Sequence, residues 1–230
     1  VIPVLTPVLA LVLTLVLALL SVPASGAQET FRLEEGDWQP IAPPDPGTPE
    51  ADLLEIRRQL AEGQSAEAEA AAEAWLSNHP DHPERPVALL TRGDARLAQQ
   101  REFKALFDYE AVARRHPDSP VFLEALEREY QIARQYARGK RRILLGMRIL
   151  PAYGEAEEIF IRIQERAPGS RLGEKASLAL ADHYHRRQER RLAATAYELF
   201  LENYPDSEQR RHAMRRLVET NLARFQGSAF

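Results

Sequence analysis

The sequence predicts an all-α protein, built as a solenoid of stacked antiparallel helical hairpins. Three observations support this fold class. Ala, Leu, Glu and Arg, which favour helices, are abundant, whereas residues that favour strands are sparse. Four prolines interrupt helical patterns at spacings of 37, 51 and 37 residues, and they are Pro80, Pro117, Pro168 and Pro205. The same pattern of small, large and apolar residues precedes each of these prolines.

The composition excludes several classes of function. The 230 residues include 44% hydrophobic and 28% charged residues, and the net charge is −4. These values are typical of a soluble globular protein and give no basic surface for nucleic acid, so no nucleic-acid partner is expected. Because cysteine is absent, disulfides, thiolate metal sites, thiol nucleophiles and a cysteine-linked lipid are excluded.

Residues 1–27 are typical of a cleaved export signal. The run Val8–Leu20 is apolar and uncharged, and Ser25 and Ala27 occupy the two small-residue positions of a cleavage site. The alternative is an uncleaved membrane anchor, because the apolar stretch 1–22 approaches the length that spans a bilayer. Both interpretations predict that the rest of the chain lies across a membrane. No basic region precedes the apolar run, so we expect that the N-terminal end is incomplete.

Residues 28–49 are rich in proline and acidic side chains, which favours an extended linker. Trp38 is the residue of this segment that we expect to pack on a neighbouring surface.

From residue 50 onward the helices carry one repeated stripe. Counting back 12, 8 and 5 residues from each proline gives Ala68, Ala72 and Trp75, then Ala105, Tyr109 and Val112, then Ala156, Phe160 and Ile163, then Ala193, Tyr197 and Phe200. Each set lies on one face of a helix. The alanine allows a neighbouring helix to approach closely, and the two larger side chains fill the space between helices. One hairpin cannot bury such a stripe, whereas stacked hairpins can.

The predicted hairpins span 50–78, 84–116, 120–167 and 170–204, with an insertion at 138–152. Each proline ends a helix, and the Asp and Ser that follow can cap the next helix. Ser119 is the clearest predicted N-cap, with Pro120 in the first turn. A fifth first helix is expected at 207–225, with an apolar face that lacks a partner: Met214, Leu217, Val218 and Leu222. This face predicts a capping helix or a truncated sequence, and we favour truncation.

The spacing of small, aromatic and apolar residues before each proline resembles the tetratricopeptide repeat, over about residues 50–227. The phrase "AATAYELFLENYPDS" and the His-Pro and Tyr-Pro joints are most similar to the periplasmic repeats of the outer-membrane protein assembly factor BamD family. This resemblance implies a scaffold, in the periplasm or attached to the outer membrane, that binds the β-barrel assembly machinery or its clients. The family's lipid anchor needs a cysteine that this chain lacks. A second similarity, to a periplasmic cell-division coordinator family, implies an adaptor in cell division or polysaccharide export.

A protein-binding scaffold would use exposed side chains of the first helices of the hairpins. The candidates for partner binding are Arg92, Arg96, Arg128, Gln131, Arg187 and Arg216.

The insertion, "ARGKRRILLGMRILPAYG", combines basic and apolar residues and is followed by glutamates. One interpretation is a basic amphipathic segment that contacts an anionic membrane surface or the groove of a partner. The other, which we favour, is a lengthened helix that packs on the third hairpin and pairs its arginines with the following glutamates. The candidate interaction residues of this segment are Arg141, Arg142, Ile143, Leu144 and Leu145.

No catalytic motif is evident. The sequence has no glycine-rich phosphate loop, no Gly-x-Ser-x-Gly and no His-Glu-x-x-His. His79 and His82 flank a Pro-Asp loop without an identifiable third ligand, and His183 and His185 point to different helix faces. We therefore assign the histidines to helix caps and surface positions. The sequence predicts no enzyme, no metal site and no cofactor.

Overall fold

The computed structural model describes residues 30–34, 37–41, 44–144 and 146–227. The chain divides into two compact units, residues 1–45 and residues 46–230. The predicted export signal, residues 1–27, lies outside the described residues, as does Leu145.

The first unit contains an antiparallel pair of strands, β1 (Thr30–Glu34) and β2 (Asp37–Ile41). Phe31 is opposite Pro40 and Leu33 is opposite Trp38. The segment expected to be an extended linker is therefore a paired hairpin over most of its first half. Extended backbone that folds back on itself satisfies its own N–H and C=O groups by pairing.

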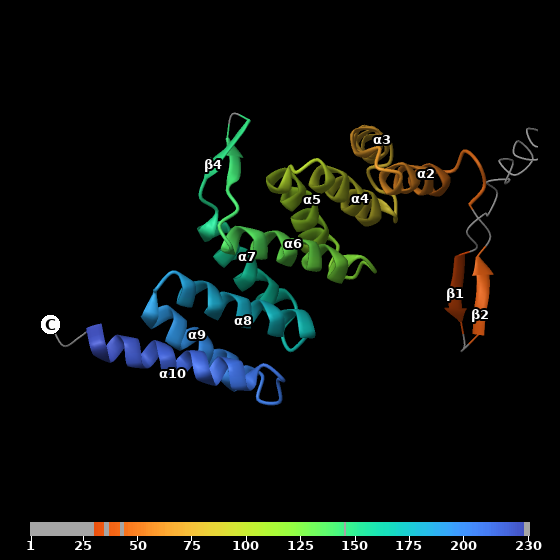
Figure 1. Cartoon of the computed structure of the whole chain (residues 1–230). Coiled ribbons are helices and arrows are strands. Elements are labelled where there is room, and N and C mark those ends of the chain that lie inside the picture. The colour runs from red at the N-terminus through yellow and green to blue at the C-terminus, as the bar shows by residue number, and fades with distance from the viewer. Residues whose placement is uncertain (1–29, 35–36, 42–43, 145, 228–230) are drawn as a thin grey trace, which may run out of the picture. The chain divides into compact units, whose positions relative to one another are not determined.

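The second unit is a row of helical hairpins (Figure 1). The helices described in it are α2 (Pro49–Ala61), α3 (Ser65–Asn78), α4 (Arg85–Ala98), α5 (Glu102–Arg115), α6 (Phe122–Ala137), α7 (Tyr153–Arg166), α8 (Arg171–Arg186), α9 (Arg190–Asn203) and α10 (Arg210–Gly227). Each helix packs against the next one along the chain. The predicted all-α solenoid of antiparallel hairpins is confirmed. Within the described residues, no helix is both long and apolar enough to cross a membrane.

The proline joints repeat one backbone conformation. The residue before each proline, which is His79, His116, Ala167 or Tyr204, has φ between −135° and −127° and ψ between 54° and 65°. Proline disfavours helical angles in the residue before it, so the helix ends there in all four cases.

Capping follows the prediction at the Pro168 joint but differs from it at the other three joints. Ser170 is a true N-cap, because its Oγ accepts a hydrogen bond from the Gly173 N–H at 3.0 Å. Ser119 is not the N-cap of α6, which begins three residues later at Phe122. Its Oγ accepts instead from the Val121 N–H at 3.3 Å within the turn, because an extra turn separates Pro120 from the helix.

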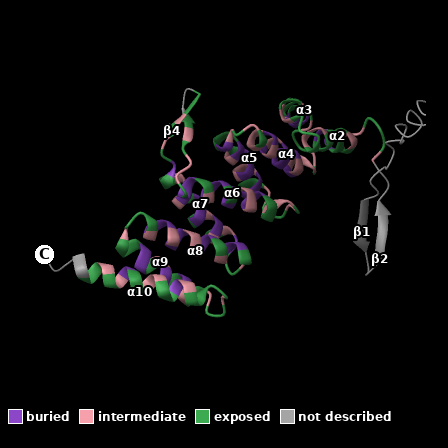
Figure 2. Cartoon of the chain, viewed as in Figure 1, coloured by how far each residue is buried: buried purple, intermediate pink, exposed green. Residues whose placement is uncertain are grey.

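The predicted stripe forms the core of the solenoid. All twelve stripe residues are at most 3% exposed, and Figure 2 shows the buried faces turned toward neighbouring helices. Helices α4 and α5 approach each other closely at Gly93. A Cβ atom there would lie 2.5 Å from Cε1 of Tyr109, so glycine allows the two helices to meet.

The insertion is a second β-hairpin, so the expected lengthened helix is wrong. Gly139 (φ +98°) ends α6, and an antiparallel pair follows, β3 (Arg142–Leu144) and β4 (Met147–Leu150). Gly146 has φ +79° between the strands, a conformation that glycine adopts freely. The expected pairing with glutamate is confirmed for Arg142, which forms an ion pair with Glu155.

Helix α10 carries the apolar face that the sequence predicts. Met214, Val218 and Leu222 are exposed, while Leu217 packs partly against the core. Ala213 and Thr220, on the opposite side of the helix, are buried.

Candidate partner-binding groove

The first helices of the hairpins lie next to one another. Helix α2 contacts α4, α6 contacts α8, and α8 contacts α10. We call the surface formed by these five helices the first-helix face. It is the surface on which a repeat protein of this kind presents side chains to a partner.

A groove of about 290 Å³ lies between α6 and α8 on the first-helix face. We call it the basic groove. Four cations, two carboxylates and several apolar side chains line it, including Arg134, Arg138, Lys175, Arg186, Glu127, Asp182, Tyr130, Phe160 and Leu178. The rings of Tyr130 and Phe160 pack with their centroids 5.9 Å apart and are buried beneath the charged groups.

Three of the cations in the basic groove have no ion-pair partner in the described part of the chain. Among the described residues, no carboxylate oxygen lies within 4.0 Å of the guanidinium of Arg134, Arg138 or Arg186. The guanidinium of Arg134 lies 5.7 Å from the centroid of the Tyr130 ring. Because these charges are uncompensated, the groove is a positive site in a chain whose net charge is −4.

The carboxylates of the groove are already engaged. Asp182 accepts a hydrogen bond of 2.6 Å from the Tyr197 hydroxyl, and Glu127 accepts one of 2.7 Å from Gln131 Nε2. The pKa of Tyr197 is raised by burial and by its bond to Asp182, so this hydroxyl stays a donor. The groove therefore offers its cations, rather than its carboxylates, to a ligand.

The basic groove continues into a neighbouring cavity of about 440 Å³, which shares Ala137, Arg138 and Arg186 with it. Tyr153 and Arg187 complete the lining of this cavity. The Arg187 guanidinium lies 4.8 Å from the centroid of the Tyr153 ring. The combined surface is lined by residues of α6 and α8, by residues that directly follow them, and by α7.

A pocket of opposite character lies toward the N-terminal end of the first-helix face. It has about 270 Å³ and is lined by α2, α4 and the start of α6. Its side chains include the apolar Leu60, Val87, Leu90 and Val121, the cation Arg57, and the carboxylates Glu84, Asp94 and Glu124. We call it the acidic pocket. Arg128 Nε donates to Asp94 Oδ1 at 2.9 Å and thereby compensates part of its charge.

Arg92 and Arg96 are not exposed, contrary to the prediction. They are 17% and 14% exposed, and both donate to Asp108, at 2.6 Å and 2.7 Å. Burial raises the pKa of Asp108, and the two guanidinium groups offset part of that rise. Arg96 also donates to Glu69 at 2.9 Å. These arginines therefore join α4 to α3 and α5.

The other four predicted candidates lie in different places. Gln131 lines the basic groove and Arg187 lines the cavity that continues it. Arg128 lies beside the acidic pocket, and Arg216 forms an ion pair with Glu219 at 2.9 Å on α10.

Sequence reasoning missed Arg134, Arg138, Lys175 and Arg186. One signal could have found most of them: consecutive first helices, α6 and α8, both end in arginines. Cations at the last turn of a helix are also favoured by its dipole.

The histidines have structural roles. The rings of His79 and His82 pack on Trp75, at centroid distances of 4.9 Å and 5.2 Å. His183 is buried between the rings of Tyr153 and Tyr184, so its assignment to a surface position is wrong. Among the residues that the structure describes, no three potential metal ligands form a cluster.

Two segments, 87–119 and 175–207, match the family model of the tetratricopeptide repeat. Equivalent positions of the two segments have the same geometry. The Tyr109 hydroxyl donates to Asp94 at 2.7 Å, as Tyr197 donates to Asp182 at 2.6 Å, and the turns contain Gln100 (φ 58°) and Gln188 (φ 59°). A search of curated proteins finds no match. The chain therefore contains tetratricopeptide repeats, arranged in an α-solenoid that is typical of protein-interaction scaffolds.

Proposed function

We propose that this protein is a non-catalytic scaffold whose basic groove binds an acidic, extended segment of a partner protein. The observation that carries the proposal is a set of three guanidinium groups between α6 and α8, those of Arg134, Arg138 and Arg186, which form no ion pair with any residue that the structure describes. Guanidinium groups bind carboxylates through paired, charge-assisted hydrogen bonds. The apolar side chains between them supply contact area for the stems of the bound residues.

Charge complementarity also predicts which way a bound segment lies along the first-helix face. A segment with acidic residues at the basic groove and an apolar or basic residue at the acidic pocket would match both sites of the first-helix face. A uniformly acidic segment would match only the basic groove.

The test measures binding of a fluorescent Glu-rich peptide, with Gln-rich and Lys-rich peptides of the same length. We expect binding of the Glu-rich peptide alone, weakened by salt because the contacts are ionic. The double substitution Arg134→Glu and Arg186→Glu should weaken binding at least about tenfold. The matched control is Arg115→Glu, which reverses an exposed charge on α5 and should leave binding unchanged.

Two results would overturn the proposal. One is equal affinity for the Glu-rich and Gln-rich peptides. The other is full binding by the doubly substituted chain with its helical circular dichroism intact.

We also propose that the protein acts in the cell envelope, exported to the periplasm and associated with the outer membrane. The support is the signal-like sequence of residues 1–27 and the resemblance of the joints to outer-membrane assembly factors. The expected partners are components of the β-barrel assembly machinery or their clients. The alternative is an adaptor in cell division or polysaccharide export.

A photo-crosslinking residue at position 138, inside the basic groove, separates these envelope roles. Crosslinks to barrel-assembly proteins would support the first role, and crosslinks to division or export proteins would support the alternative. The same residue at position 115 is the control for nonspecific capture. Recovery of the chain from the cytoplasm with residues 1–27 still attached would contradict both envelope roles.

A further inference from the structure

The base of the β3–β4 hairpin is fixed to the helices by charged contacts. Glu102, at the start of α5, is buried. Its Oε1 forms ion pairs with Lys140 Nζ at 2.5 Å and with Arg148 Nη2 at 3.0 Å. Burial alone would raise the pKa of Glu102, but the hydrogen bonds from Arg148 and Lys140 outweigh it and hold the pKa below its usual value. The Arg142 guanidinium lies 3.6 Å from the centroid of the Phe103 ring. The hairpin is thus held in one orientation.

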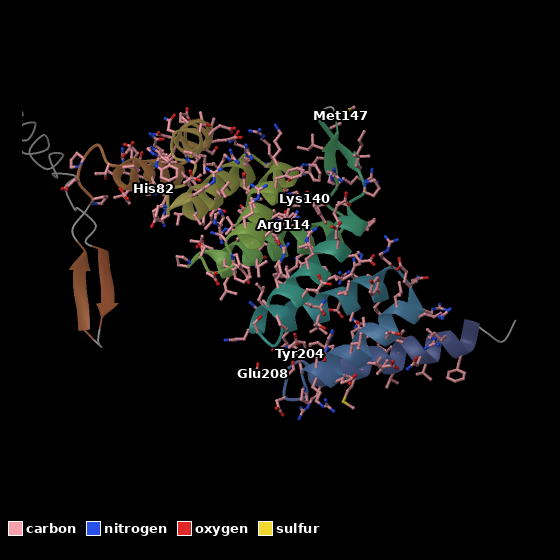
Figure 3. All side chains as sticks on the ribbon, turned by 180° about the vertical axis from the view of Figure 1, so that it is seen from behind. His82, Arg114, Lys140, Met147, Tyr204 and Glu208 are labelled. Carbon is pink, nitrogen blue, oxygen red and sulfur yellow. The ribbon has the colours of Figure 1, made fainter. Side chains whose placement is uncertain are left out.

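The outer end of the hairpin is apolar and exposed. Ile143, Met147 and Ile149 are 44%, 58% and 44% exposed. Figure 3 shows Met147 at the far end of the projecting hairpin and Lys140 near its base. Exposed apolar side chains gathered on a projecting element mark an interaction site.

The register of the strands places apolar side chains on both faces. Leu144 pairs with Met147 and Ile143 pairs with Arg148. Paired residues share a face and successive residues alternate, so Ile143 and Met147 lie on opposite faces. A flat protein surface would cover one of these faces, whereas a lipid surface surrounds an inserted hairpin and covers both.

The charge around the hairpin is positive. Five cations stand in residues 138–148, and Glu102 and Glu155 are the carboxylates that pair with three of them, Lys140, Arg142 and Arg148. Arg141 is exposed, and no carboxylate oxygen of the described residues lies within 4.0 Å of its guanidinium. Basic residues beside an apolar insertion strengthen binding to anionic lipid.

Apolar surface continues from the hairpin along α5. The exposed ring of Phe107 makes an edge contact with Phe103, at a centroid distance of 5.0 Å. Phe103 in turn contacts Arg142 of β3, so the exposed aromatic surface begins at the base of the hairpin.

We propose that the β3–β4 hairpin inserts its apolar end into an anionic lipid surface and so holds the solenoid at a membrane. This anchor is independent of the basic groove, because the apolar residues that insert take no part in lining that groove.

The two methionines of this cysteine-free chain, Met147 and Met214, allow a matched test. Each is replaced by cysteine in the full chain and labelled with an environment-sensitive fluorophore. On vesicles of phosphatidylglycerol and phosphatidylethanolamine, we expect the emission of the label at position 147 to shift to the blue and brighten. The label at position 214, on the exposed face of α10, should not respond. This readout is local, so binding by residues 1–27 would not imitate it.

Vesicle flotation supplies the affinity. Changing Ile143, Met147 and Ile149 together to Ser should weaken flotation at least about tenfold, because the hairpin loses its apolar end. The matched triple change of Met214, Val218 and Leu222 to Ser should have no effect. Arg141→Glu should weaken binding to anionic vesicles more than binding to vesicles of phosphatidylcholine. Preserved helical circular dichroism would show that each variant is folded.

Two outcomes would overturn the anchor. One is a label at position 147 that stays in water while the chain is bound to vesicles. The other is flotation that survives the hairpin triple change, or that is lost equally in the α10 triple change. A label at position 147 that responds only to an added protein partner would assign the hairpin to protein binding instead.

Discussion

The two tetratricopeptide segments, 87–119 and 175–207, form the same hairpin with different side chains at its centre. In the first segment, Arg92 and Arg96 of α4 enclose the buried Asp108 of α5. The equivalent positions in the second segment hold Leu180, Tyr184 and Ala196. The comparison teaches that an arginine on a first helix is structural where the second helix offers a carboxylate. Where no carboxylate is offered, as for Arg134, Arg138 and Arg186, it stays free for a partner.

The largest expected effect is the loss of the buried carboxylate. Asp108→Ala removes the buried carboxylate that two mostly buried guanidinium groups share and leaves them only their contacts with Glu69 and Glu73, so the free energy of unfolding should fall by about 3 kcal/mol. Urea unfolding followed by circular dichroism measures the change. Asp118→Ala, at an exposed position in the proline joint, is the control and should change stability by no more than about 0.5 kcal/mol.

Transplanting the second segment's side chains sharpens the comparison. Arg92→Leu, Arg96→Tyr and Asp108→Ala together replace the ion cluster by the apolar set found at the equivalent positions. Stability should return to within about 2 kcal/mol of the original, because buried ion clusters often contribute little beyond a well-packed apolar core. A triple variant that is as unstable as Asp108→Ala alone would contradict the equivalence of the two segments.

The stability of the fold is expected to depend on pH through Glu129 of α6, which lies between the two segments in the sequence. Its carboxyl group is fully buried, and burial together with the nearby Glu110 raises its pKa to about 7, against the favourable charges of Arg162 and Arg166. The folded chain therefore binds this proton more tightly than the unfolded chain does. The stability that the protonated group contributes is complete below about pH 4.5 and is lost as the pH rises through 7.

Glu129→Gln should remove this pH dependence. At pH 8 the variant should be more stable than the original chain by about 2–3 kcal/mol, and at pH 4.5 the two should be nearly equal. Thermal unfolding at several pH values measures the difference. Glu165→Gln, at an exposed position, is the control. If the stability of Glu129→Gln changed with pH in the same way as that of the original chain, Glu129 would be excluded as the source of the pH dependence.

Close helix packing predicts that one methyl group has opposite effects on stability in the two segments. Adding it destabilises the first segment, and removing it destabilises the second. Gly93→Ala would place Cβ against the Tyr109 ring and should destabilise the fold by about 1–3 kcal/mol, although alanine favours helices. Ala181→Gly, at the equivalent position facing Tyr197, should cost about 1 kcal/mol through helix propensity and lost packing. A stabilised Gly93→Ala variant would show that the ring moves freely.

The smallest effect is expected in the basic groove. Arg186→Ala removes a guanidinium without an ion-pair partner, so stability should change by no more than about 0.5 kcal/mol while binding of the Glu-rich peptide falls. A loss of stability as large as that of Asp108→Ala would mean that this arginine is structural. The comparison between paired and unpaired arginines would then fail.

Much of the fold could be predicted because it depends on periodic residues. The stripe from Trp75 to Phe200 and the prolines determine which faces are buried and where helices end, and both are visible in the sequence. The β3–β4 hairpin could not be predicted in the same way, because basic and apolar residues in 138–152 fit a helix or a hairpin. Gly139 and Gly146, both with positive φ, decide between them.

The basic groove was harder to predict than the fold. Arg92 and Arg134 both lie on first helices, and their exposure depends on whether a carboxylate such as Asp108 faces them from another helix. That facing residue is set by three-dimensional packing rather than by spacing along the chain. His183 illustrates the same limit, since its burial depends on Tyr153 from the preceding hairpin.

The closely similar backbone angles at the four proline joints have a consequence for how such a chain changes over generations. A duplicated or deleted hairpin would meet its new neighbour through the same angles, so the number of units can vary by copying whole segments of DNA without redesign of the contacts. New features arise instead at the turn inside a unit, where the glutamine turn of Gln100 and Gln188 is replaced after α6 by Gly139 and a projecting hairpin. Length and specialisation are thus altered at separate places in the gene.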